Sequence, residues 1–145
     1  MDSLLVSACL LGFDCKYSGG NNALASSDLV KLRSKYRLIP VCPETAGGLP
    51  TPRTPSERRG EKVCTSLSED VTAQFKKGAD IALVLARKYA VFGALLKENS
   101  PSCGSGTIYD GSFSGVLVPG DGVTVEALKA LGLKVFGESR LDELL

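Results

Sequence analysis

The sequence predicts an α/β fold, a small single domain with a mostly parallel sheet of about four strands flanked by helices. Short apolar runs alternate with segments of helical periodicity along the chain, an order that is typical of parallel sheets. No internal repeat, low-complexity tract or linker divides the 145 residues. This length suffices for one hydrophobic core. We therefore expect residues 1–145 to form one domain.

The first part of the chain is predicted to alternate strand, loop, helix and strand. An apolar run at residues 3–8 favours a short buried strand. The segment 12–22 is rich in Gly, Asn and Asp, which is typical of a loop. Ser27 and Asp28 are candidate caps of a helix that ends near residue 34. A second apolar run at residues 37–41 predicts the next strand.

The middle of the chain is predicted to be a long loop followed by the longest helix. Residues 43–60 are rich in Pro, Gly and charged side chains and show no periodicity. A loop of this length in a small domain is usually functional or mobile. Ser66 and Glu69 have the spacing of a capping box. They are expected to begin a helix whose apolar positions recur to about residue 90.

The last part is predicted to add two strands around a short helix. A third apolar run covers residues 91–97, and the Gly-rich segment 106–120 is expected to form a loose hairpin or an irregular segment. Apolar residues at helical spacing in 125–131 predict a helix that stops at Gly132. Residues 133–136 then supply the last strand.

The composition excludes several classes of function. The chain has 17 Lys and Arg against 16 Asp and Glu, a net charge of +1. This balance gives no electrostatic argument for a nucleic-acid polymer or a membrane surface as a partner. The absence of His excludes a Ser/His/Asp triad, a Cys/His pair and every metal site that needs His. Any catalysis must use Cys, carboxylates, Lys, Ser, Tyr, the backbone or a cofactor.

The five cysteines are expected to be reduced. The apolar run before Cys9 is too short for a signal peptide and lacks a basic segment ahead of it. We therefore expect a cytoplasmic protein. In that compartment cysteines are thiolates or metal ligands more often than disulfides. An odd number of cysteines also disfavours a closed disulfide framework.

Three of the predicted strands are followed by a cysteine, namely Cys9, Cys42 and Cys103. Because the carboxyl ends of parallel strands share one edge of a sheet, these side chains are expected to lie close together, with Cys15 nearby. The absence of a C-x-x-C pair disfavours a structural zinc site. Thiolates from separate loops suit an iron–sulfur cluster, in which an iron without a protein ligand is a Lewis acid. Each cysteine is alternatively a small buried apolar side chain.

Polar side chains close to these cysteines are candidates for catalysis and substrate binding. Glu44 is a candidate general acid or base. Ser100 and Ser102 shortly precede Cys103, and Ser102 is expected to contact the substrate. Arg53 is a candidate for binding an anionic substrate group such as a phosphate. The competing interpretation is that these residues cap helices, bond to loop amides or belong to a solvated face of mixed charge.

Three motifs together resemble one known family. They are VSACLLG at residues 6–12, VCPETAGGLPTPR at 41–53, and SPSCG at 100–104 followed by Tyr-Asp-Gly at 109–111. In this order they are similar to the DUF523 family, which includes thiouracil desulfidases. The resemblance covers essentially the whole chain.

The resemblance implies a specific enzyme. Its cofactor would be a [4Fe-4S] cluster held by only three cysteines, here Cys9, Cys42 and Cys103. Glu44 would be the acid or base, and Ser100 its partner in handling substrate or water. The substrate would be a thiolated pyrimidine, such as 4-thiouracil or its nucleoside or nucleotide. Its sulfur would be removed by hydrolysis at the open iron, without net redox chemistry.

Two other functions remain compatible with the sequence. A thiol-based sulfur-relay protein would carry a persulfide on Cys15 or Cys103 and would act without iron. A metal-stabilised binding module would turn over no thiolated substrate and would unfold when its metal is removed. The sequence makes no prediction of the oligomeric state.

Overall fold

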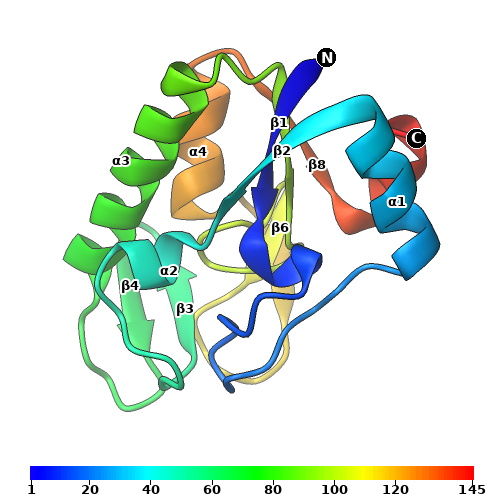
Figure 1. Cartoon of the computed structure of the whole chain (residues 1–145). Helices are drawn as coiled ribbons and strands as arrows, with labels where there is room; N and C mark the ends of the chain where they lie inside the picture. The colour runs from blue at the N-terminus through cyan, green and yellow to red at the C-terminus, as the bar shows by residue number, and fades with distance from the viewer.

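The computed structural model describes residues 1–145 and contains a four-stranded parallel sheet at its centre (Figure 1). The strand order is β2-β1-β5-β8, and every neighbouring pair is parallel. The predicted α/β class with about four parallel strands is therefore confirmed. The four strands are β1 (Asp2–Ser7), β2 (Tyr36–Val41), β5 (Gly93–Leu96) and β8 (Lys134–Gly137).

Helices cover both faces of this sheet (Figure 1). Side chains alternate between the two faces along a strand, so Leu5 packs toward one core and Leu4 toward the other. The core that contains Leu5 includes α3 (Thr72–Lys88) and α4 (Val123–Ala130). The core that contains Leu4 includes α1 (Ser26–Lys35) and the 3₁₀ helix η2 (Glu138–Glu143).

None of the helices is long and apolar enough to cross a membrane.

Residues 43–60 are not the continuous loop that the sequence predicts. Pro43 occupies the first turn of a short helix, a position where proline is well tolerated. The strand that follows is entirely polar and forms only because its backbone pairs with a second strand. Neither the short helix nor this polar strand has an apolar pattern of its own. These elements are α2 (Pro43–Ala46) and the antiparallel pair of β3 (Ser56–Arg59) and β4 (Lys62–Thr65).

The hairpin predicted within residues 106–120 is confirmed. It consists of β6 (Thr107–Tyr109) and β7 (Leu117–Pro119), which are paired antiparallel. A 3₁₀ helix, η1 (Ala8–Leu11), follows β1 directly.

Two predicted helix starts are wrong. Ser66 and Glu69 lie in a turn ahead of α3, where the Thr65 hydroxyl accepts a hydrogen bond from the Glu69 N–H. Ser68 has a left-handed backbone (φ 65°), which no residue inside a helix adopts. Ser27 and Asp28 lie inside the first turn of α1, because Ala25 is its N-cap.

The short helix α2 lies directly against α3. A Cβ atom added at Gly78 of α3 would be 1.9 Å from the carbonyl oxygen of Pro43. A Cβ atom added at Gly47, just after α2, would be 2.0 Å from the carbonyl oxygen of Gln74. Glycine at both positions permits this close approach, which fixes where α2 holds its side chains.

Candidate metal centre and active site

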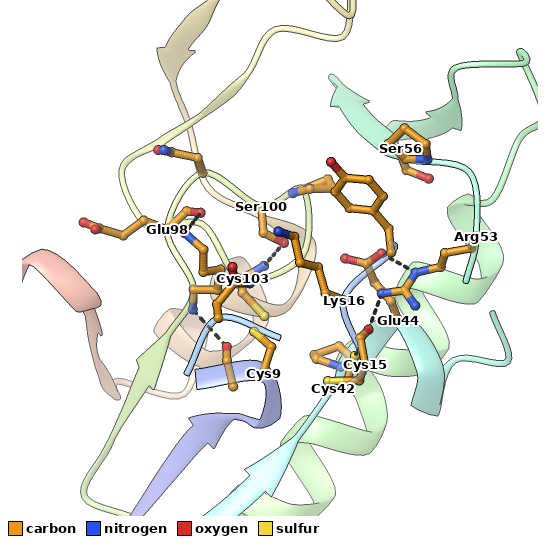
Figure 2. Close-up of a pocket in the computed structure, with 18 of the residues that line it drawn as sticks. Cys9, Cys15, Lys16, Cys42, Glu44, Arg53, Ser56, Glu98, Ser100 and Cys103 are labelled. Atoms are coloured by element: carbon orange, nitrogen blue, oxygen red, sulfur yellow. Dashed lines mark hydrogen bonds and ion pairs between the residues drawn. The ribbon is translucent and has the colours of Figure 1, made fainter. Parts of the chain in front are cut away.

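A cavity of about 630 Å³ lies at the carboxyl ends of β1, β2 and β5. Four of the cysteines line it, and Figure 2 shows them grouped in one part of the cavity. Cys64 lies in β4 and does not line it. The cysteines of the cavity are Cys9 in η1, Cys15 in the loop that follows, Cys42 between β2 and α2, and Cys103 in a turn beyond β5.

Strand register explains why cysteines far apart in sequence meet here. Ser7 at the end of β1 is aligned with Val41 at the end of β2, so Cys9 and Cys42 follow neighbouring strand ends. Beyond β5, the hydroxyl of Ser100 accepts hydrogen bonds from the N–H groups of Ser102 (3.1 Å) and Cys103 (3.0 Å). These bonds close the turn that places Cys103 beside the other two thiols.

Burial raises the pKa of three thiols in this cavity, those of Cys9, Cys15 and Cys103. Desolvation by burial raises the pKa of Cys103 to about 12, although a hydrogen bond from the Ser7 side chain partly opposes the effect. Desolvation, with the neighbouring Cys42 as a second cause, raises the pKa of Cys15 to about 12. The pKa of Cys9 is also raised, mainly by burial. The thiols would lose their protons more readily if a cation were bound among them.

Glu44 places a carboxylate at the wall of the same cavity. It lies in the first turn of α2, and its side chain is 18% exposed. Its Oε1 atom accepts a hydrogen bond from Nε of Arg53 at 3.0 Å. Its Oε2 atom has no hydrogen-bond partner in the protein. Glu44 therefore has one oxygen fixed by an ion pair and a second oxygen available for a ligand or water.

The structure separates the two residues predicted to bind substrate. Arg53 lines the cavity, but its guanidinium already bonds to Glu44 and to the carbonyl oxygen of Cys15. Ser102 does not line the cavity and is fully buried. Its hydroxyl instead hydrogen-bonds to the hydroxyl of Thr124 in α4 at 2.9 Å. The structure thus brings Glu44, Ser100 and Arg53 to the cavity but not Ser102.

Sequence reasoning missed several other side chains of the cavity wall. Lys16 lines the cavity and forms no ion pair, and its position next to Cys15 was the signal that could have identified it. Glu57 in β3 accepts hydrogen bonds from the N–H groups of Gly111 (3.0 Å) and Phe113 (3.1 Å). No sequence signal links β3 to the β6–β7 loop. The aromatic residues of the wall are Tyr17, Tyr109 and Phe113.

Comparison with known proteins identifies the family of this chain. The model of the 2-thiouracil desulfurase family matches residues 4–140. This chain belongs to the 2-thiouracil desulfurase family. The resemblance to DUF523 that the sequence motifs indicate is thereby confirmed.

Two relatives match nearly the full length of this chain. A solved structure of the [4Fe-4S]-dependent thiouracil desulfidase TudS (DUF523Vcz) is 49% identical and superposes with a TM-score of 0.94. The match covers 99% of this chain and 95% of that one. The protein YbbK of Bacillus subtilis (strain 168) is 41% identical over 152 residues, which cover 98% of this chain and 99% of YbbK. This chain is therefore homologous to a [4Fe-4S]-dependent enzyme.

The donor set of this 2-thiouracil desulfurase family member fits a multi-iron cluster better than a single ion. No three His, Cys, Asp or Glu side chains are arranged to hold one metal ion. A cluster accepts more widely spaced thiolates, because each cysteine binds a different iron. The thiols of Cys9, Cys42 and Cys103 come from separate segments of the chain and line one cavity. The cavity also lies within the size range of small-molecule sites.

Proposed function

We propose that this protein is a [4Fe-4S]-dependent desulfidase that removes sulfur from thiolated pyrimidines by hydrolysis. Its substrate would be 4-thiouracil or the corresponding nucleoside or nucleotide. The observation that carries the proposal is one cavity lined by three thiols from separate strand ends and by Glu44 and Ser100. The homology to a thiouracil desulfidase supports the same conclusion. The whole chain, residues 1–145, would form one iron–sulfur domain.

Three cysteines are proposed to hold the cluster. They are Cys9, Cys42 and Cys103, and Cys15 lies beside them without being needed as a ligand. When bound, the cluster would supply a Lewis-acidic iron that polarises the thiocarbonyl group of the substrate. The overall reaction replaces C=S by C=O, consumes one water and releases hydrogen sulfide, so neither an oxidant nor a reductant is needed.

The side chains of the protein are proposed to handle water, protons and the planar ring. The free Oε2 of Glu44 would take a proton from the attacking water and return it to a leaving group. Both lone pairs of the Ser100 hydroxyl accept backbone N–H groups, so its O–H remains free to donate to substrate or water. The aromatic side chains of the wall, Tyr17 and Phe113 among them, suit the face of a pyrimidine.

Anaerobic reconstitution with iron and sulfide tests the proposal. We expect a brown protein with about four iron atoms per chain, which converts 4-thiouracil to uracil and releases sulfide in equal amounts. Turnover by iron-free protein would instead indicate a thiol-based sulfur relay. A stable metal-bound protein without turnover would indicate a binding module. Either result would overturn the proposal.

The chain offers matched cysteine controls for the ligand assignment. The Cys103→Ala variant should lose most of its iron and its turnover, because a proposed ligand is removed. The Cys64→Ala variant removes a cysteine of β4 outside the cavity and should keep both. The Cys15→Ala variant should also keep its iron. If Cys103→Ala retained a full cluster, or if Cys15→Ala lost it, the three proposed ligands would be the wrong set.

A further inference from the structure

Nearly every donor of the Arg53 guanidinium is used within the protein. The side chain is only 6% exposed, and its Nε donates to Oε1 of Glu44 at 3.0 Å. Nη1 donates to the carbonyl oxygen of Pro50 (3.2 Å) and to the hydroxyl of Thr51 (3.0 Å). Nη2 donates to the carbonyl oxygen of Cys15 at 2.9 Å. These bonds use four of the five N–H groups of an arginine, so a substrate anion could bind to the guanidinium fork only by breaking some of them.

The backbone of Arg53 reinforces the same connection. Its N–H donates to the carbonyl oxygen of Tyr17 at 2.8 Å. The carbonyl oxygen of Cys15, which accepts Nη2 of Arg53, also accepts the thiol of Cys42 at 3.7 Å. Figure 2 shows the guanidinium between Glu44 and Cys15. Arg53 thus joins α2 to the loop that carries Cys15.

We propose that Arg53 is a positioning residue for the Glu44 carboxylate rather than an anchor for the substrate. By holding Oε1, it fixes the rotation of the carboxylate and leaves Oε2 directed at the reacting groups. A carboxylate that is largely removed from water also requires a charged partner, which Arg53 provides. This inference rests on the proposed function, in which Glu44 transfers protons.

Kinetics of the reconstituted Arg53→Gln and Arg53→Lys enzymes test the inference. We expect kcat to fall about 10- to 100-fold, because displacing a reacting group by about 1 Å lowers the reaction rate by up to about this factor. KM should change little. The loss should be equal for 4-thiouracil and for 4-thiouridine monophosphate. Lysine keeps the charge but lacks the planar fork, so Arg53→Lys should not restore kcat. A rise in KM confined to the nucleotide would show a phosphate anchor and overturn the inference.

A double-mutant cycle isolates the link to Glu44. If Arg53 acts through Glu44, adding Arg53→Gln to Glu44→Gln should change kcat by less than about 2-fold. Fully multiplicative losses would contradict the inference. The Arg58→Gln variant is the matched control, because Arg58 pairs with Glu126 at 2.6 Å and does not line the cavity. Its kcat should equal that of the unmodified enzyme.

Iron content separates a positioning role of Arg53 from a contribution to cluster binding. Thermal stability should fall in Arg53→Gln, because Glu44 and the carbonyl oxygens lose their donor, but iron content should remain close to that of the unmodified enzyme. A loss of iron that accounts for the loss of activity would show a merely structural role. If the unmodified enzyme turned over no thiolated pyrimidine, the proposed function would fail. The crystal structure of Arg53→Gln would then decide the inference, since an unmoved Glu44 carboxylate contradicts it.

Discussion

Among the individual residues of the cavity, the buried Cys103 thiol links protonation to stability most directly. Its pKa is raised from an ordinary value of 9.0 to about 12 by desolvation. Below pH 9 the thiol is protonated in both the folded and the unfolded chain, so its full contribution to stability is present. Between pH 9 and 12 the unfolded chain loses this proton while the folded chain keeps it. Stability therefore falls as the pH rises through this interval.

We expect the cluster-free protein to lose stability above pH 9, by about 1.4 kcal/mol per pH unit for one thiol of this kind. Urea unfolding between pH 8 and 10.5, under anaerobic reducing conditions, measures the slope. The Cys103→Ala variant is the control, because it lacks the thiol and should show a shallower decline. If stability fell equally with pH in the two proteins, the Cys103 thiol would not be a cause of the decline.

Ser100 combines a structural role with its proposed catalytic one. Since its hydroxyl accepts two backbone N–H groups of the turn that carries Cys103, Ser100→Ala should destabilise the protein by about 1 kcal/mol, as the loss of a helix cap does. Ser100→Thr retains the oxygen and should keep most of this stability. Urea unfolding of the three proteins measures the difference. Equal stability of Ser100→Ala and the unmodified protein would show that the two bonds contribute nothing.

At the level of elements, the contact between α2 and α3 sets the position of the catalytic candidates. The helix α2 directly follows Cys42 and carries Glu44, and it packs on α3 where Gly78 faces the Pro43 carbonyl. The contact leaves no room for a side chain. A change in α3, remote from the cavity in sequence, should therefore act on the site.

We predict that Gly78→Ala destabilises the protein by about 1 to 3 kcal/mol, because the added methyl group overpacks the contact. In an open helix position the same change would stabilise by up to about 1 kcal/mol, so the sign is diagnostic. Lys77→Ala is the matched control, since Lys77 is an exposed neighbour on α3. Thermal unfolding and iron content of both variants test the effect. A Gly78→Ala protein of increased stability would refute the close packing of α2 on α3.

Some helices and strands could be predicted from the sequence alone, and others could not. The central strands were predictable because each is a short apolar run, and the cysteines because they follow the ends of such runs. The polar β3 and the single turn of α2 leave no periodic signal, so residues 43–60 were expected to be a loop. Arg53 hydrogen-bonds to the carbonyl oxygen of Cys15, and Ser102 hydrogen-bonds to the hydroxyl of Thr124. Both of these partners are distant in sequence. Only the folded chain brings such partners together.

In the molecule as a whole, the cavity lies at one end of a sheet that has its own hydrophobic cores. Strands β1 and β5 contribute fully buried side chains to the cores on both faces. Of the three proposed ligands, only Cys103 is counted among the buried core residues. Most of the apolar burial that stabilises the fold is thus independent of a metal centre.

This arrangement predicts that removing the cluster leaves the protein folded. After anaerobic chelation of iron, far-UV circular dichroism should keep its α/β signature, and thermal unfolding should remain cooperative at a lower Tm, because a ligand that binds only the folded state stabilises it. Hydrogen exchange should become faster in the Cys15 loop and the turn around Cys103. It should be unchanged in β1 and β5, which serve as the internal control. Loss of the far-UV signal on chelation would instead show that the metal holds the fold together, as in a small metal-stabilised binding module.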